Sequence, residues 1–296
     1  MDGCISRVKV TALIDNTTHY EGPILAENGI SLLVEAEGEY LKGRILFDTG
    51  LTGRSLINNC NVLGVDLGEV DAIVLSHNHY DHTGGLLEAL KKISKPLPVI
   101  MHPDIFKPKY AILPRLGIKK LTYTGPPFKK EDIEANGGLI VPSRSPVSIV
   151  EGVTTTGEIE RVTEFEEVEG FYVVEDGTFR RDNIPDDQAL VVKMCDGGIV
   201  ILIGCGHSGV VNTVLHSLKI TGVNHVNALI GGFHLIDASD LRIEKTISEL
   251  KKVKLKMIAP MHCTGFRAKK KISEDLPERF KEIYCGESIE VEAKGL

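Results

Sequence analysis

The 296-residue chain contains no tryptophan, and aromatic residues make up only 5% of it. Its core must therefore be built mainly from Val, Ile and Leu. No apolar run approaches the roughly 18 residues that a membrane-spanning helix needs. The N-terminal stretch MDGCISRVKV also lacks the basic and apolar regions of a signal peptide. These absences predict a globular protein of the cytoplasm that does not enter a membrane.

An excess of basic residues is missing as well, since 34 Lys and Arg stand against 41 Asp and Glu, giving a formal net charge of −7. Nucleic acids and anionic membrane surfaces require a basic face, so we expect neither as a partner. The six cysteines form no C-x-x-C pair and follow no regular spacing, which predicts no disulfide framework and no zinc knuckle. Homo-oligomer formation is compatible with the sequence, which does not determine it.

Strand-type and helix-type segments alternate along the chain. Alternating or continuous apolar runs predict strands over 7–15, 29–37, 43–48 and 70–77, and the spacing of apolar residues predicts an amphipathic helix over 84–93. Helices are also expected over 208–220 and 240–252. Asp196-Gly197 predicts a tight hairpin, because this pair tolerates the positive φ angles of such a turn. With no repeat or composition break, residues 1–296 are expected to form one mixed α/β domain.

Residues 95–150 differ from the rest in holding most of the 13 prolines together with many lysines. This composition predicts a loop-rich insertion whose charges are solvated. The alternative is a lid whose basic side chains bind an anion, with Lys107, Lys109 and Arg115 as candidates.

The stretch VLSHNHYDHTGG, residues 74–85, places His77, His79, Asp81 and His82 within six positions directly after an apolar run. In an extended segment His77 and His79 point the same way, because side chains alternate with period two. Asp81 and His82 follow one step later, where they can reach a second metal ion. A lone histidine is usually structural, but four clustered ligand-type side chains are typical of a metal site. Imidazole and carboxylate ligands suit Zn²⁺, and also Fe or Mn.

Three more histidines, His207, His234 and His262, each follow an apolar run in the C-terminal half. Because ligands bind at the carboxyl ends of strands in α/β sheets, we expect these residues to converge on one crevice. We predict that His207 is a metal ligand and that His234 binds substrate or transfers a proton. Glu158 and then Cys205 are the alternatives for a further or bridging ligand, since a buried cysteine is more often an inert apolar residue.

Two further residues are candidates for contact with a substrate. Ser208 is a plausible N-cap, and the helix that begins there would present its free amides to an anion such as phosphate. Asp187 precedes an apolar strand and is expected either to face the same crevice or to lie in a solvated turn.

The H-x-H-x-D-H stretch after a buried strand resembles the hallmark of the metallo-β-lactamase superfamily, and ILFDTG at 45–50 resembles its upstream strand. The resemblance implies an αβ/βα sandwich of two mixed β-sheets flanked by helices. It also implies that His77 and His79 bind one metal ion while Asp81 and His82 bind the other. By the same resemblance, His262 in PMHCTG is the final ligand and Asp48 supports the site.

A set of further stretches, TTTGEIER, DDQALVV, IGCGHSGVVNT and IGGFHL, resembles the branch of the superfamily named for dihydropterin-ribofuranosylaminobenzene 5′-phosphate synthase. The branch implies a phosphorylated small-molecule substrate. It leaves two chemistries open, which are ester hydrolysis and transfer of a dihydropterin-methyl group with pyrophosphate as the leaving group. A non-catalytic metal-binding protein is the alternative of another class, but structural zinc sites are usually closed by four ligands.

The clustered histidines predict one or two transition-metal ions per chain, and zinc is the metal that we expect, with Fe or Mn as alternatives. Elemental analysis of the purified protein checks this number directly. A protein that contains no metal and gains none on reconstitution would contradict the prediction.

Overall fold

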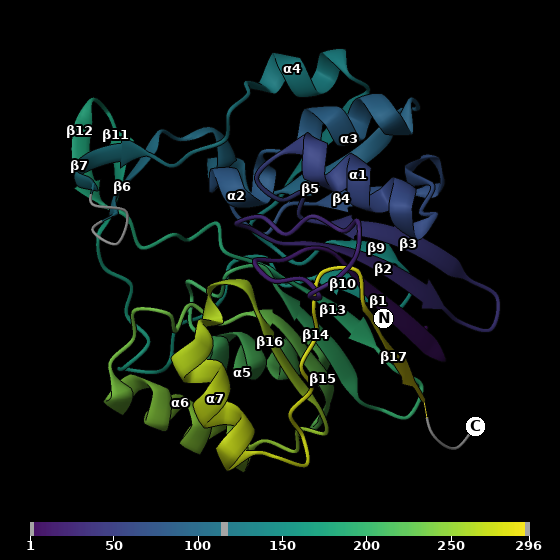
Figure 1. Ribbon diagram of the computed structural model, residues 1–296, viewed down its shortest axis with the longest axis vertical. Helices are drawn as coiled ribbons and strands as arrows, with labels where there is room; N and C mark the ends of the chain where they lie inside the picture. Colours follow the sequence, from purple (N-terminus) through teal and green to yellow (C-terminus); the bar gives the residue numbers. More distant parts are fainter. Residues whose placement is uncertain (1–2, 114–117, 294–296) are drawn as a thin grey trace.

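Two mixed β-sheets lie face to face and carry helices on their outer surfaces (Figure 1). The computed structural model describes residues 3–113 and 118–293, so the predicted anion ligand Arg115 lies outside the described residues. This arrangement confirms the α/β class and the layered sandwich that the resemblance implied. Among the described residues, no helix combines the length and apolar character needed to cross a bilayer.

The first sheet has seven strands, and β3, β4, β5 and β8 run parallel. Its strands in spatial order are β17 (Ser288–Glu292), β1 (Arg7–Ile14), β2 (Ser31–Glu37), β3 (Lys42–Phe47), β4 (Ala72–Val74), β5 (Leu97–Met101) and β8 (Gly138–Pro142). The helices that cover its outer face are α1 (Gly53–Leu63), α3 (Leu86–Ile93) and α4 (Lys130–Ala135), while the short α2 (Tyr80–Thr83) follows the end of β4 (Figure 1).

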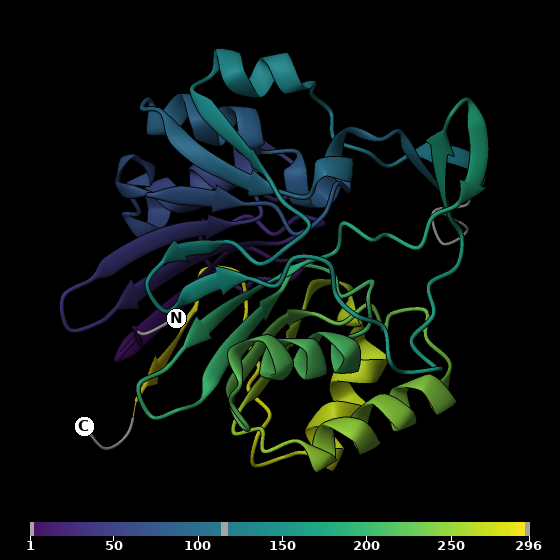
Figure 2. The same cartoon turned by 180° about the vertical axis from the view of Figure 1, so that it is seen from behind.

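The second sheet has six strands, and β14, β15 and β16 are parallel neighbours. In spatial order these are β16 (Ile258–Met261), β15 (Val226–Gly232), β14 (Ile199–Ile203), β13 (Ala189–Lys193), β10 (Val153–Thr155) and β9 (Ser148–Val150). The helices on its outer face are α5 (Val210–Thr221), α6 (Asp240–Lys252) and α7 (Phe266–Asp275) (Figure 2). The predicted helix over 240–252 and the hairpin at Asp196-Gly197 between β13 and β14 are both confirmed.

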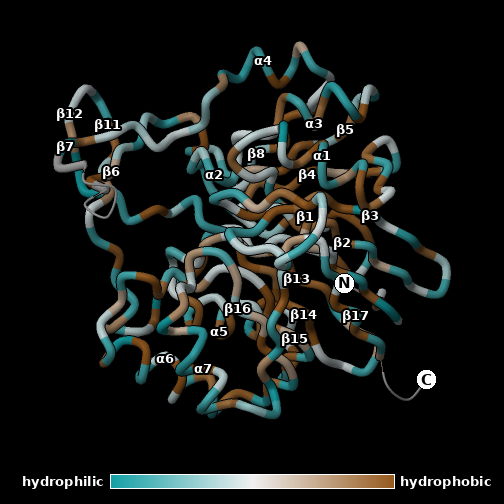
Figure 3. Tube along the Cα trace, in the orientation of Figure 1, coloured by the Kyte–Doolittle hydropathy of each residue, from teal (hydrophilic) through white to brown (hydrophobic). Residues whose placement is uncertain are grey.

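Apolar side chains form the core in three layers. One layer lies between the sheets and includes Phe47 and Leu202, and the other two lie between each sheet and its helices. Figure 3 shows the most hydrophobic parts of the chain concentrated along the strands, with hydrophilic stretches on the outer helices. Because β14 and β15 are buried on both faces, β14 is a continuous apolar run and β15 is apolar or glycine except for Asn227, as is usual for parallel strands.

A third, four-stranded sheet projects from one side of the sandwich (Figures 1 and 2). We call it the side sheet; its strands in spatial order are β12 (Thr178–Arg181), β11 (Phe171–Glu175), β6 (Lys109–Leu113) and β7 (Ile118–Tyr123). The predicted loop-rich insertion at 95–150 is therefore wrong in large part, since this segment also supplies β5 and β8 to the first sheet and β9 to the second. Its strands are short and interrupted by prolines, which hides their periodicity in the sequence.

The two lysines that we considered as anion ligands in this segment are already paired within the protein. Lys107 Nζ lies 2.7 Å from Asp104 Oδ2 and 2.6 Å from Glu175 Oε1. Lys109, which is almost fully buried, pairs with Asp182 and Asp186. Burial of an ammonium group requires such partners, so Lys109 attaches the side sheet to the sandwich instead of meeting an anion from solvent.

A disulfide joins Cys4 to Cys195, which corrects the expectation drawn from the scattered cysteines. The two residues are 191 positions apart in the sequence, and a parallel bridge between Ile5 and Met194 brings them together. Spacing patterns along the chain cannot reveal such a pair, because only the packing of the N-terminal segment against the β13–β14 hairpin creates it.

We expect the Cys4→Ser substitution to lower the free energy of unfolding by about 2–4 kcal/mol, because the cross-link restricts the unfolded chain over a long loop. Denaturant titration without reductant measures the change. The Cys195→Ser variant and reduced wild-type protein should show a similar loss, whereas Cys60→Ser, at a free buried thiol, is the control for cysteine replacement itself. A wild-type midpoint that does not change on reduction would contradict the prediction.

Candidate metal centre

The ends of neighbouring strands in the two sheets meet at one edge of the sandwich and bring the predicted ligands together. His77 and His79 follow β4 of the first sheet, while His207 follows β14 of the second and His262 follows β16. Two groups of three potential ligands result, His77–His79–His207 and Asp81–His82–His262, and within each group the ligand atoms lie within 4.8 Å of one another. All six residues that we predicted as metal ligands are therefore in these two groups.

In the first group three ring nitrogens face a common point. His77 Nε2 lies 2.9 Å from His79 Nδ1, and His207 Nε2 lies 3.2 Å from the same atom. Burial lowers the pKa of all three histidines, that of His79 to about 3, and the positive charge of neighbouring histidines lowers the pKa of His77 and His207 further. These imidazoles are therefore neutral near pH 7 and can offer lone pairs to a cation.

The second group combines one carboxylate with two imidazoles. Asp81 Oδ2 lies 3.6 Å from His262 Nε2, and the rings of His82 and His262 have centroids 5.0 Å apart. His82 Nε2 and His262 Nε2 are buried and have no hydrogen-bond partner among the described residues. An unpartnered buried polar atom is costly, so two such nitrogens beside a carboxylate fit a bound metal ion.

Asp48 orients the ring of His82, in agreement with its predicted supporting role. His82 Nδ1 donates to Asp48 Oδ2 at 2.7 Å, which directs the other ring nitrogen, Nε2, towards the second group. The carboxylate also accepts from Ser76 N and Ser76 Oγ, both at 2.7 Å. Burial alone would lower the pKa of His82, but Asp48 and Asp81 raise it to about 9, so a metal ion that binds Nε2 would displace a proton from it.

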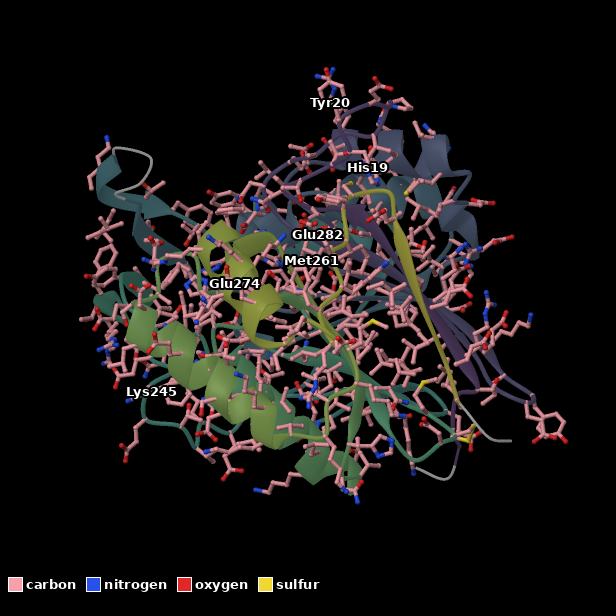
Figure 4. The ribbon with its side chains drawn as sticks, turned by 60° about the horizontal axis from the view of Figure 1, so that its bottom comes forward. His19, Tyr20, Lys245, Met261, Glu274 and Glu282 are labelled. Atoms are coloured by element: carbon pink, nitrogen blue, oxygen red, sulfur yellow. A yellow bond between two sulfur atoms is a disulfide. The ribbon has the colours of Figure 1, made fainter. Side chains whose placement is uncertain are left out.

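His262 is held in the same manner by two residues that the sequence analysis missed. Its backbone N–H donates to Asp15 Oδ1 at 2.7 Å, and its Nδ1 donates to Asn16 Oδ1 at 2.6 Å, which directs Nε2 to the second group. In Figure 4 Met261, the last residue of β16, lies in the interior, whereas His19 and Tyr20 mark the outer part of the loop after β1. Asp15 is the last residue of the predicted strand 7–15 and Asn16 follows it, and this position at a strand end is the signal that could have identified them.

The backbone at the centre is strained. Asp48, His234 and His262 have φ angles of 59°, 45° and 44°, and they account for half of the six non-glycine residues with positive φ in the described part of the chain. Such conformations cost free energy and persist where the surroundings impose them, typically at functional sites. All three lie just beyond the end of a strand.

Cys205 and His234 also lie at this edge. The Cys205 sulfur is within 4.8 Å of ligand atoms of His77 and His82, and the rings of His234 and His207 have centroids 4.2 Å apart. Both residues are thus beside the two groups, and the bridging role of Cys205 and the substrate role of His234 remain predictions.

Glu158 is not brought to the centre, which corrects our expectation for it. Its carboxylate accepts from His102 Nε2 at 2.9 Å and pairs with Arg144, and it belongs to neither group of ligands. The turn after β10, where Gly157 has a φ of 64°, directs the chain towards these partners instead.

Ser208 does not cap the helix as predicted. Helix α5 begins at Val210 with Gly209 at the N-cap, and the amides of Val211 and Asn212 each donate to the Glu166 carboxylate at 2.9 Å. An internal carboxylate therefore already occupies the helix start at which we expected a phosphate.

Asp187 is buried and not part of a solvated turn. Its Oδ2 accepts from Ser208 N at 2.6 Å, its Oδ1 has no partner within residues 3–113 and 118–293, and burial raises its pKa to about 6. Asp187 therefore fixes the loop that carries His207.

The side sheet contributes an aromatic ring that the sequence analysis also missed. The centroid of Phe171, on β11, lies 5.1 Å from those of both His79 and His207. The buried Lys109–Asp186 pair connects the same sheet to the loop after β4 that carries His77 and His79, because Asp186 Oδ2 accepts from Asn78 N at 3.0 Å. No local pattern indicates this contact, which depends on how β6 and β11 pair.

The first group offers three imidazole nitrogens, and the second offers a carboxylate oxygen and two imidazole nitrogens, so the donor sets fit Zn²⁺, Fe or Mn. Three-ligand sites leave a coordination position open and are typical of catalytic metals. The model for the metallo-beta-lactamase superfamily matches residues 31–170. Together with the relatives described next, this match shows that the chain belongs to the metallo-β-lactamase superfamily.

Within that superfamily, the chain is 40% identical over 291 residues to 7,8-dihydropterin-6-methyl-4-(beta-D-ribofuranosyl)-aminobenzene-5′-phosphate synthase of Methanocaldococcus jannaschii, covering 97% of this chain and 98% of the relative. It is 34% identical over 267 residues to an uncharacterized protein of the same organism, covering 90% and 94% of the two chains. A crystal structure described as a metal-dependent hydrolase of the beta-lactamase superfamily matches with a TM-score of 0.79 and 26% identity, covering 96% of this chain and 99% of that one.

We expect Asp48→Asn to weaken metal binding by the second group about 10- to 100-fold, because the amide no longer holds the His82 ring as a carboxylate does. Competition with a chelator, followed by counting the ions that remain, measures this loss. Asp71→Asn is the matched control, since Asp71 is exposed and its carboxylate accepts from Arg44 N on β3. Equal metal retention by both variants would show that Asp48 does not support the site.

Proposed function

We propose that the protein is a metal-dependent enzyme that joins a dihydropterin-methyl group to a 4-(ribofuranosyl)aminobenzene phosphate. The observation that carries this proposal is the 40% identity to the synthase over 97% of the chain, combined with two three-ligand groups at one edge of the sandwich. We further propose zinc as the metal, a phosphorylated small molecule as the only substrate class, and the cytoplasm as the compartment.

In the proposed reaction the amine of the aminobenzene substrate attacks the methylene carbon of the dihydropterin donor. The new C–N bond forms as the C–O bond to pyrophosphate breaks, and the leaving oxygen takes the bonding electron pair. The metal ions, when bound, supply the positive charge that holds the phosphate oxygens and offsets the charge developing on the leaving group.

Residues of this chain provide the remaining functions. His234 lies beside His207 on the partly exposed side of the centre, and its Nδ1 is the atom next to Cys205, so we assign its Nε2–H to a hydrogen bond with the substrate while the amine proton passes to water. Phe171 offers a flat apolar ring next to the first group, where the planar pterin can stack. Asp48 and Asn16 keep the rings of His82 and His262 in a fixed orientation, so that no reorganisation is needed when substrate binds.

Hydrolysis of a phosphoester or other ester is the second candidate. It is favoured by the likeness to the metal-dependent hydrolase, which has a TM-score of 0.79. The ligand set suits both reactions, and the choice between them depends on whether the site admits an amine or only water next to the donor. A non-catalytic metal-binding role agrees less well with two groups that each leave a coordination position open.

The metal-loaded protein should condense the dihydropterin pyrophosphate with the aminobenzene ribosyl phosphate and release pyrophosphate. Mass spectrometry of the product, run beside a panel of phosphodiesters and other esters, measures this. Ester cleavage without any condensation product would reject the synthase and support the hydrolase.

His79→Ala and Asp81→Ala should each lower turnover by at least about 100-fold while leaving the fold intact, because each removes a metal ligand. Steady-state kinetics measures the turnover, and circular dichroism shows whether the fold is intact. His225→Ala is the matched control, as His225 lies near Asp196 at the opposite end of β15. Full turnover in either ligand variant would exclude this centre.

A further inference from the structure

Two buried thiols face each other beside the metal groups, and the proposed reaction uses neither. Cys205 Sγ lies 3.1 Å from Cys263 Sγ, and His234 Nδ1 lies 3.5 Å from Cys205 Sγ. The cysteines are only 4% and 9% exposed. The three ligand atoms lie within 4.8 Å of one another, so they form a group as compact as the two histidine groups.

These residues come from three successive strand ends of the second sheet. Cys205 follows β14, His234 follows β15, and Cys263 lies in the short 3-10 helix His262–Thr264 after β16. Because the three strands are parallel neighbours, their carboxyl ends reach the same edge. The group therefore depends on the topology of the sheet and not on a local sequence motif.

The backbone around the thiols leaves room for the sulfur atoms. A Cβ atom at Gly232 would collide with Gly204 O and would lie 2.8 Å from Cys263 Sγ, so glycine at this position gives room to both the neighbouring backbone and the sulfur. The strained φ of 45° at His234 turns its backbone N–H towards Cys263 Sγ, at 3.3 Å. Glycine and strain at neighbouring positions hold the sulfurs and the imidazole close together.

We propose that Cys205, His234 and Cys263 form a third metal site, which binds one thiophilic cation such as Zn²⁺ or Cu⁺. Two sulfurs and one nitrogen are a softer donor set than the nitrogen and oxygen donors of the other groups, so they select a different class of ion. With metal–sulfur distances of about 2.3 Å, the two sulfurs need to move apart to roughly 3.8 Å.

Cys205 is also within reach of His77 and His82, which gives the main competing assignment. In that case its sulfur belongs to the histidine groups and Cys263 is only a neighbour. Cys263 distinguishes the two assignments, because it groups with Cys205 and His234 and not with His77 or His82.

An ion bound by Cys205, His234 and Cys263 would cross-link the loops that carry His207, His234 and His262. Direct links between these loops include the hydrogen bond of 3.1 Å from Phe233 N to Thr264 Oγ1. The third ion would therefore fix the relative positions of ligands in both histidine groups without itself meeting the substrate.

Titration of metal-free protein with Co²⁺ under oxygen-free conditions tests the proposal. Wild-type protein should bind three Co²⁺ and develop the near-ultraviolet charge-transfer absorption of cobalt–thiolate bonds. Cys263→Ala should bind two Co²⁺ and lose most of this absorption. Cys60→Ala, at a buried thiol far from the group, should behave like wild-type protein.

Wild-type protein that binds no more than two Co²⁺ and shows no thiolate absorption would overturn the proposal, and this result needs no variant to fold. Absorption retained in full by Cys263→Ala would also overturn it and assign Cys205 to the histidine groups. His79→Ala should lose a cobalt ion but keep the thiolate absorption. The result for the third metal site at Cys205, His234 and Cys263 therefore does not depend on which reaction the enzyme catalyses.

Discussion

Neutral imidazoles buried with their nitrogens facing one another are the constraint on which the rest of the structure depends. His77, His79 and His207 place three ring nitrogens around one point, and burial keeps them uncharged. Such an arrangement is unfavourable unless a cation accepts the lone pairs. The polar contacts around the centre follow from this need, since Asp48 and Asn16 fix the rings whose free nitrogens point inwards.

Each sheet supplies part of the centre, so the site exists only when the sandwich is assembled. The first sheet contributes the loop after β4 and the Asp15–Asn16 turn, and the second contributes the strand ends that carry His207 and His262. The apolar layer between the sheets therefore stabilises the fold and sets the distance between ligands. The side sheet adds the ring of Phe171 beside His79, so it contributes to the surroundings of the ligands and not to the ligand set itself.

Sequence patterns were informative wherever structure is local. The apolar runs located the principal strands, and the helix over 240–252 matched α6 residue for residue. They failed where the hydrogen-bond or strand-pairing partner of a residue lies far away in the sequence. Glu166 accepts hydrogen bonds from the amides at the start of α5, so Ser208 is not the cap. The short strands of residues 95–150 can be recognised as strands only from their pairing with distant segments.

The sequence by itself determined the superfamily, the sandwich and the six ligand-type residues, because H-x-H-x-D-H is contiguous and each later histidine follows an apolar strand. Only the tertiary structure decided that His207 joins the first group and His262 the second, that Glu158 lies elsewhere, and that Cys4 meets Cys195. It also placed Cys205 against Cys263. These outcomes depend on which strand ends become neighbours, and that is set by the packing of whole sheets rather than by any segment of the chain.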